Sequence, residues 1–275
     1  MKIVRLLVLL GATSLTLGLV AAPAASRTTH AAARSPRSVS APKGMPSVGR
    51  RDPHVTGPAA SYLYVYGHQY ATASGASVAL RQARPAVSAG DSHSLAELAV
   101  QSADGQQIVE VGWTVALDVN GDTQPHLFVF HWVDRIPTCY NGCGFVQVSS
   151  TITPGDPVAV GSTGIYRITF ARNKWWVYYN KAKVGYFPAS LWSGRYKQAG
   201  LIQAFGEVDA GSTSPCTDMG NGKFGSAPKS ATISKFALTG SAALPSLGVS
   251  WTNASLYDGG NITPTSFRFG GPGAC

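Results

Sequence analysis

Glutamate is scarce in this chain: only Glu97, Glu110 and Glu207 occur among 275 residues. Two of the three stand inside apolar, glycine-rich strings, at 108–113 (IVEVGW) and 202–208 (IQAFGEV). Burying a carboxylate in such surroundings costs several kcal/mol unless it is paired or takes part in chemistry. We therefore take Glu110 and Glu207 as the leading candidates for a two-carboxylate acid/base site.

The motifs of several hydrolase classes are also missing. No H-E-x-x-H string occurs, which argues against a zinc hydrolase. No G-x-S-x-G string occurs, which argues against an α/β-hydrolase serine enzyme. The six histidines show no metal-ligand spacing. The sequence therefore predicts no metal and no cofactor, and carboxylates remain as the catalytic groups.

After the N-terminal stretch, no uninterrupted apolar run approaches the ~20 residues that a membrane-spanning helix needs. At the start, Lys2 and Arg5 precede an apolar stretch over 6–19, and residues 22–24 (APA) offer a small-residue cleavage pattern. We interpret residues 1–25 as a secretory signal peptide. We expect a secreted, extracellular protein with no membrane contact after signal cleavage.

The four cysteines are Cys139, Cys143, Cys216 and Cys275. An even number in an oxidising compartment favours two disulfides, for which three connectivities are possible. One of these closes a tight loop between Cys139 and Cys143 and ties the C-terminus back to Cys216. No histidine lies near these cysteines, which argues against a metal site.

The formal net charge is +9, from 22 basic and 13 acidic residues. Part of it lies in a Ser/Ala/Pro-rich tract before about residue 55, which carries Arg27, Arg34, Arg37, Lys43, Arg50 and Arg51. We interpret residues 26–55 as a disordered linker or a short pro-segment. Basic residues beyond residue 60 are scattered, so we expect no nucleic-acid partner. Attraction to an anionic cell wall is a weaker use of the charge.

Residues 56–275 have the length and the glycine- and aromatic-rich composition of a single all-β sandwich or barrel. Strands are predicted at 62–66, 76–82, 108–117, 126–133, 144–149, 166–171, 174–179, 201–210 and 231–238. The segment 92–99 has helix propensity but is too short to decide by periodicity, and we predict a strand there.

Alternation along the predicted strands assigns the faces of the two candidate glutamates. Glu110 projects opposite Val109, Val111 and Trp113, and Glu207 shares a face with Gln203 and Phe205. Aromatic side chains are more often core than ligand-binding. Our candidate substrate-binding residues are Trp113, Trp132, Gln203, Phe205, Trp176 and Tyr186.

Several strings together resemble the neprosin family of secreted glutamic peptidases. They keep their order from about residue 62 to the last residue. The strings are Glu110-Val-Gly-Trp113, Gly121-Asp122 followed by Leu127-Phe128 and Trp132, Cys139-Tyr-Asn-Gly-Cys143-Gly-Phe-Val-Gln147, Trp175-Trp176, Val184-Gly-Tyr-Phe-Pro188 with Leu191-Trp192, Gly206-Glu207-Val208, Met219-Gly-Asn-Gly222 and Phe269-Gly-Gly-Pro-Gly-Ala-Cys275.

The resemblance implies an antiparallel β-sandwich of two curved sheets with few or no long helices. It places the two catalytic glutamates on Glu110 and Glu207, and the family's tight cysteine pair on Cys139 and Cys143. It also implies cleavage after proline, and a pro-segment released at low pH that suits residues 26 to about 55. One departure is the string Ala204-Phe205-Gly206 before the second glutamate, where the family usually has Trp-Gly-Gly. This change affects subsite preference more than the chemistry.

We therefore predict a secreted glutamic endopeptidase, prolyl endopeptidase-like, that hydrolyses peptide bonds at acidic pH. One ionised glutamate takes a proton from water, while the other, protonated, assists the scissile carbonyl and the leaving nitrogen. The sequence does not assign the two roles. The expected partner is a proline-containing peptide or protein, and a monomer is expected. The alternatives are a two-carboxylate glycoside hydrolase and a catalytically silent β-sandwich binding module for cell-wall polymer or peptide.

Overall fold

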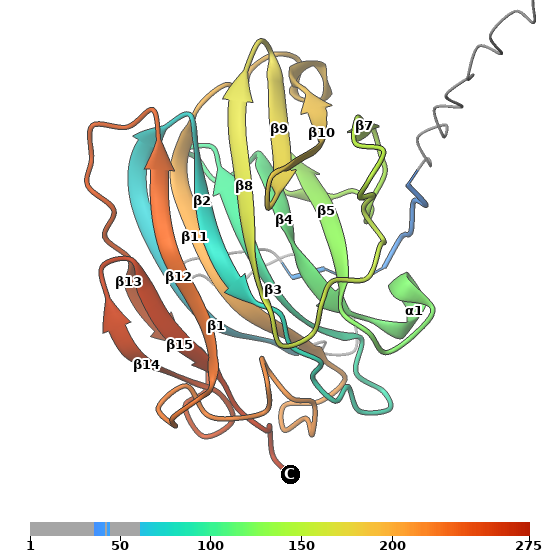
Figure 1. Cartoon of the computed structure of the whole chain (residues 1–275), viewed down its shortest axis with the longest axis vertical. Coiled ribbons are helices and arrows are strands. Elements are labelled where there is room, and N and C mark those ends of the chain that lie inside the picture. Colours follow the sequence, from blue (N-terminus) through green and yellow to red (C-terminus); the bar gives the residue numbers. More distant parts are fainter. Residues whose placement is uncertain (1–35, 42, 45–60) are drawn as a thin grey trace, which may run out of the picture. The chain divides into compact units, whose positions relative to one another are not determined.

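The computed structural model describes residues 36–41, 43–44 and 61–275 of the chain. The predicted signal peptide at 1–25 lies outside the described residues. Within them the chain forms two antiparallel β-sheets, one short α-helix, α1 (Leu117–Asn120), and a 3-10 turn, η1 (Ala189–Trp192). This confirms the predicted all-β sandwich (Figure 1).

The first sheet has seven strands in the order β13-β1-β11-β3-β4-β5-β6. Their bounds are β13 Gly248–Trp251, β1 Ser61–Ala73, β11 Ala199–Ala210, β3 His93–Gln101, β4 Ile108–Val115, β5 His126–Val133 and β6 Ile136–Pro137. β3 confirms the strand predicted at 92–99, and β5 has the predicted bounds. The centre of this sheet therefore consists of β11, β3 and β4, the three strands that carry the glutamates.

The second sheet has eight strands in the order β14-β15-β12-β2-β8-β9-β10-β7. Their bounds are β14 Asp258–Thr263, β15 Ser266–Gly270, β12 Ala231–Thr239, β2 Gly75–Arg81, β8 Thr163–Ala171, β9 Lys174–Tyr179, β10 Ala182–Pro188 and β7 Val146–Gln147. The strands predicted at 166–171 and 174–179 are confirmed as β8 and β9, which pair as an antiparallel hairpin. The segment predicted at 144–149 shortens to the two residues of β7, and β10 and β13 to β15 escaped prediction.

The main hydrophobic core lies between the two sheets, and alternation along the strands explains it. On β4 the core receives Val109, Val111 and Trp113, all fully buried. On β11 it receives Ile202, Ala204, Val208 and Ala210, which follow the same alternation with Gly206 between them. The predicted faces are therefore correct, and Glu110 and Glu207 project from the opposite side of the first sheet.

A second apolar cluster covers that opposite side. It contains Leu95, Ala99, Ile108, Ala116, Val119, Phe128, Phe130, Trp132, Tyr140 and Phe205. Val39 and Ala41 from the N-terminal part of the chain pack against it. The first sheet is thus buried on both faces, and on the face away from the main core the glutamates lie among these apolar side chains.

Two disulfides join all four cysteines, Cys139 with Cys143 and Cys216 with Cys275. Of the three possible connectivities, this is the one that closes the tight 139–143 loop and ties the C-terminus to Cys216. In the described part of the chain, no helix is long and apolar enough to cross a membrane.

Replacing Gly112 by alanine is expected to lower the free energy of unfolding by ~1–3 kcal/mol, because overpacking a closed site forces the backbone to move. A Cβ at this position would meet the Ala96 carbonyl oxygen and lie 2.6 Å from the Cβ of Glu97. Denaturant unfolding measures the loss. Gly248→Ala is the matched control, since its nearest neighbour is the His68 side chain at 3.2 Å. Equal stability of the two variants would contradict the tight β3–β4 contact.

Candidate active site

Strand register brings all three glutamates of the chain to one place. Glu207 pairs with Leu95 across the β11–β3 ladder, and Glu110 pairs with Ala99 across the β3–β4 ladder. Glu97 lies midway between Leu95 and Ala99 on β3. It is therefore the diagonal neighbour of both other glutamates, and such neighbours lie ~7–8 Å apart on one sheet face. The predicted convergence of Glu110 and Glu207 is observed, with a third carboxyl group between them.

The side chain of Lys43 lies at the centre of this cluster. Its Nζ is 3.1 Å from Glu97 Oε1, 3.1 Å from Glu207 Oε2 and 3.7 Å from Glu110 Oε2. All four side chains are fully buried. One position in space is thus within reach of three carboxyl groups at once.

Lys43 belongs to an N-terminal strap, by which we mean the described residues 36–41 and 43–44. The strap is fixed to the domain by its backbone. Val39 and Tyr140 exchange two hydrogen bonds, of 3.1 and 2.8 Å. The Gly44 N–H donates to Glu207 Oε1 at 3.0 Å. The strap therefore lies across the carboxylate face of the first sheet.

The three carboxyl groups differ in their other hydrogen bonds. Trp132 Nε1 donates to Glu110 Oε1 at 2.9 Å. His93 Nε2 lies 2.8 Å from Glu207 Oε1. The only described partner of Glu97 is Lys43, and its Oε2 is buried without a hydrogen bond among the described residues. The donors available to each group thus make the three chemically unequal.

A short polar chain extends from Glu207 along the sheet. His93 and Asp209 are paired across the β3–β11 ladder, with Nδ1 and Oδ2 3.9 Å apart. Ser92 Oγ lies 3.3 Å from His93 Nδ1. A histidine flanked by carboxylates on both sides is held in one orientation, and here it presents Nε2 to Glu207.

The environment separates the proton affinities of the three glutamates. Burial, followed by the Glu110 carboxyl, holds the pKa of Glu97 well above its ordinary value. Burial raises the pKa of Glu110 to about 7 against the opposing effect of Lys43. Burial acts in the same sense on Glu207, but Lys43 and the His93 hydrogen bond outweigh it, so the pKa of Glu207 lies below its ordinary value.

Of the three glutamates, Glu207 is the one whose pKa shift favours the ionised form. Burial acts to lower the pKa of Lys43, but the three carboxyl groups outweigh it and keep the ammonium charged. Near neutral pH, one ammonium then faces an ionised Glu207, a titrating Glu110 and a protonated Glu97. Buried charges are tolerated when they are paired, and this protonation pattern brings the cluster close to neutrality.

Two of the predicted substrate-binding residues lie at the cluster. Trp132 donates to Glu110, and Phe205 has its ring centroid 5.5 Å from Lys43 Nζ. Phe205 also makes an edge-to-face contact with Tyr64. Gln203 shares the sheet face but lies further along β11, where it bonds to Gln101. Trp132 and Phe205 therefore form aromatic walls beside the carboxyl groups.

The other three predicted residues do not join the cluster. Trp113 is fully buried in the core between the sheets, on the opposite face from Glu110. Trp176 and Tyr186 pair across β9 and β10 of the second sheet, where they contact each other and Lys174. Their grouping with the glutamates is corrected here, because the sequence does not state which sheet a strand joins.

Sequence reasoning missed Glu97, His93 and Lys43. Glu97 offered a signal, since it is the remaining glutamate and also lies in an apolar run. A strand at 92–99 places His93 and Glu97 on one face, but their neighbours depend on the strand order. Lys43 lies in a low-complexity tract and offered no signal beyond its charge.

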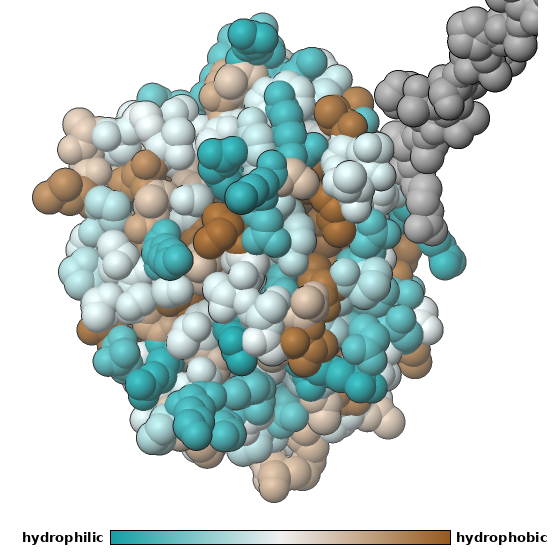
Figure 2. All heavy atoms as spheres, viewed as in Figure 1, coloured by the Kyte–Doolittle hydropathy of each residue, from teal (hydrophilic) through white to brown (hydrophobic). Residues whose placement is uncertain are grey.

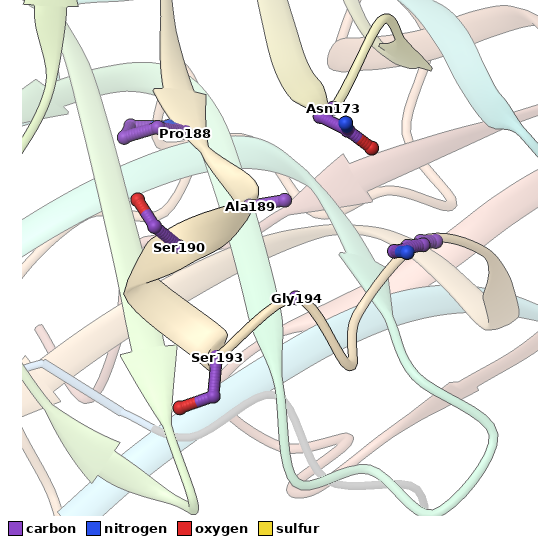
Figure 3. Close-up of a pocket in the computed structure, with 7 residues that line it drawn as sticks. Asn173, Pro188, Ala189, Ser190, Ser193 and Gly194 are labelled. Carbon is purple, nitrogen blue, oxygen red and sulfur yellow. The ribbon is translucent and has the colours of Figure 1, made fainter.

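Two pockets of the described surface lie away from the glutamates, and neither is lined by a carboxyl group. One pocket of about 440 Å³ lies around η1 and is lined by Asn173, Pro188, Ala189, Ser190, Ser193, Gly194 and Lys197 (Figure 3). Another, of about 430 Å³, lies between the strap and the 139–143 disulfide loop. No group of three or more His, Cys, Asp or Glu side chains suited to a metal ion occurs among the described residues.

The fold is a β-sandwich, and the carboxyl groups buried on one of its sheets are side chains that can catalyse hydrolysis by acid/base chemistry. The Neprosin family profile matches residues 90–272, most of the chain and all three glutamates. The chain belongs to the Neprosin family, and this membership supports a peptidase of the glutamic type.

Several solved structures are similar to this chain at low sequence identity. Scytalido-glutamic peptidase with a transition-state analogue inhibitor matches at 10% identity and a TM-score of 0.44, covering 76% of this chain and 97% of that one. SCP-B, a member of the eqolisin family of peptidases, matches at 9% and 0.41, covering 77% and 98%. Chicken galectin 2 matches at 10% and 0.33, covering 54% and 95%. These similarities are too low to carry an argument about chemistry.

Trp132→Phe is expected to raise the pKa of Glu110 above about 7, because the variant removes the one N–H that stabilises the carboxylate form besides Lys43. Carbon-13 NMR of the glutamate carboxyl groups follows the titration. Trp175→Phe is the matched control, since the Trp175 N–H donates to the Tyr196 carbonyl instead. An unchanged Glu110 titration in Trp132→Phe would contradict the assigned hydrogen bond.

Proposed function

We propose that this protein is a secreted glutamic endopeptidase whose active site is the glutamate cluster on the first sheet. The observation that carries the proposal is the meeting of Glu110 and Glu207 within 4 Å of one point, at Lys43 Nζ. Two carboxyl groups of unlike proton affinity at one buried point are what general acid/base hydrolysis requires. Membership of the Neprosin family supports the same reaction class.

The unequal environments suggest how the roles are divided. Glu207 is the better anion, because His93 supports its ionised form, so it takes the proton from the attacking water. Glu110 has a pKa of about 7 even with Lys43 beside it, and departure of the ammonium raises that pKa, so Glu110 keeps a proton and delivers it to the leaving nitrogen. The pair titrates as a unit, and a bell-shaped pH profile follows. The alkaline side of that profile reflects loss of the proton from Glu110.

Cleavage after proline is part of the proposal. It is carried over from the family resemblance and is supported by the aromatic side chains beside the carboxyl groups. Trp132 and Phe205 offer flat apolar surfaces, to which a pyrrolidine ring is suited. Two disulfides are compatible with an extracellular site of action.

Glu110→Gln and Glu207→Gln are each expected to reduce peptide cleavage by ~10²-fold or more, since each variant removes one half of the proton transfer. The assay is hydrolysis of a proline-containing quenched peptide from acidic to neutral pH. Asp134→Asn is the control, because Asp134 is half-exposed and bonds to Gln107 away from the cluster. Wild-type rates in both glutamine variants would rule out the peptidase mechanism.

We also propose that the form described here is latent, with the strap acting as a pro-segment. Lys43 Nζ occupies the point at which water and the scissile bond would have to meet both carboxyl groups. The Gly44 N–H donates a hydrogen bond to the other carboxyl oxygen of Glu207, Oε1. With the strap in place, neither Glu110 nor Glu207 is exposed to substrate.

Acid is expected to release the strap. The Lys43 ammonium lowers the pKa of each of the three carboxyl groups, so each binds protons more readily once the strap has left. Release is therefore linked to proton uptake, and falling pH favours it. For Glu110 the effect begins above pH 7, at the higher pKa of the strap-free carboxyl group, and is complete once the pH has fallen below about 7. Protonation of Glu207 adds to it at lower pH.

After a shift to acidic pH we expect the wild type to cleave peptide with a lag, and Lys43→Met in the full chain to cleave it without one. The methionine keeps the length of the side chain but cannot pair with carboxylates. Progress curves recorded directly after the shift measure the lag, and Lys197→Met, in the remote η1 pocket, is the matched control. An identical lag in Lys43→Met and wild type would contradict latency through the ammonium.

A further inference from the structure

The proposed reaction leaves one buried group of the cluster unused. Glu97 is as close to Lys43 Nζ as Glu207 is, at 3.1 Å, and its side chain is fully buried. It projects from the strand between the two proposed catalytic glutamates. Any small polar group at the position of the ammonium is therefore in contact with Glu97 as well.

The surroundings of Glu97 favour a carboxylic acid over a carboxylate. Glu110 has the Trp132 N–H, and Glu207 has His93. Glu97 has no donor among the described residues once Lys43 is withdrawn, and its Oε2 already has no hydrogen bond. A buried carboxyl group without donors keeps its proton, and burial together with Glu110 raises the pKa of Glu97 accordingly.

A protonated carboxyl group is a hydrogen-bond donor, and the proposed reaction needs one. Attack on a peptide carbonyl places negative charge on its oxygen, and donors aimed at that oxygen give the largest single rate effect in such reactions. Gln203, one of the predicted substrate-binding residues, lies further along β11, where its Oε1 accepts a hydrogen bond from Gln101. Glu97 lies at the reaction centre itself.

We propose that Glu97 is a third catalytic residue, whose carboxylic acid O–H donates a hydrogen bond to the carbonyl oxygen of the scissile peptide bond. The inference rests on the peptidase function proposed above and adds a role to the same site. Glu97 exchanges no proton with the substrate over the cycle; its donor stabilises the charge that forms and disappears.

The steps balance with this assignment. The water oxygen bonds to the carbonyl carbon while a water proton passes to Glu207. The carbonyl oxygen becomes an oxyanion that accepts from the Glu97 O–H. The carbon–nitrogen bond then breaks as Glu110 gives its proton to the nitrogen, and the proton on Glu207 passes to Glu110. Acid and amine products leave, and Glu207 is again ionised.

The competing explanation is that Glu97 serves only as a counter-ion for Lys43 in the latent form. That role needs a negative charge and no donor, and it ends when the strap leaves. A pair of substitutions separates the two roles: Glu97→Gln retains an N–H donor, while Glu97→Met has similar size and none.

The test compares full-length wild type, Glu97→Gln, Glu97→Met and Glu207→Gln, each brought to acidic pH until its rate is constant. Hydrolysis of the proline-containing quenched peptide gives kcat and KM separately, and thermal unfolding checks each fold. We expect Glu97→Met to lose ~10²–10³-fold in kcat with little change in KM, as for loss of a donor to an oxyanion. We expect Glu97→Gln to lose no more than about tenfold, within the range left by one retained donor.

Two results would overturn the inference. Near wild-type kcat in both Glu97 variants would leave Glu97 as a counter-ion only, and a Glu97→Gln variant as impaired as Glu97→Met would show that a donor is not what matters. If Glu97→Met does not fold, Glu97→Leu, which also lacks a hydrogen-bond donor, takes its place in the comparison with Glu97→Gln. Undiminished cleavage by Glu207→Gln would instead remove the proposed function itself, so the two failures are distinguishable.

Discussion

A single ammonium held among three buried carboxyl groups is the interaction on which the site depends. Each of these charges alone would be costly to remove from water, and together they are tolerated because protons make up the difference. Lys43 can pair fully with only one carboxylate, so the other two glutamates carry protons or titrate near neutrality. The crowding of acids around one cation therefore creates the graded acidity that hydrolysis needs.

The first sheet provides this arrangement because one of its faces packs in the main core and the other carries the glutamates. Val109, Val111 and Trp113 lock β4 against the second sheet from the inner side. A slip of one residue would move these side chains outward and Glu110 into the core, so packing of the core fixes where the carboxyl group points. Figure 2 shows the chain from the same side as Figure 1, with hydrophobic residues only scattered over that face, as expected when the large apolar side chains lie inside.

Local pattern was enough to predict part of this structure. Period-two alternation assigned the faces of Glu110 and Glu207, and turn residues delimited β5 and β9. The third glutamate required the order β11-β3-β4, which arises from long-range pairing that no local string records. Because the strand order was unknown, Trp176 and Tyr186 were predicted to lie near the glutamates, although they belong to the second sheet. The place of Lys43 in the site could not be predicted from the sequence, because a lysine in a Ser/Ala/Pro-rich tract shows no periodicity that relates it to a folded partner.

In the proposed mechanism, latency and catalytic competence are coupled through the same protons. With the strap seated, Lys43 lowers the pKa of all three glutamates and the site has the charge that holds an ammonium. When acid adds protons, that attraction weakens, and departure of the ammonium raises the proton affinity of the carboxyl groups further. Of the three, Glu207 keeps its contact with His93 and remains the easiest to ionise. The protonation that frees the cluster thus also leaves it with one base and two acids, the state from which water attack can begin.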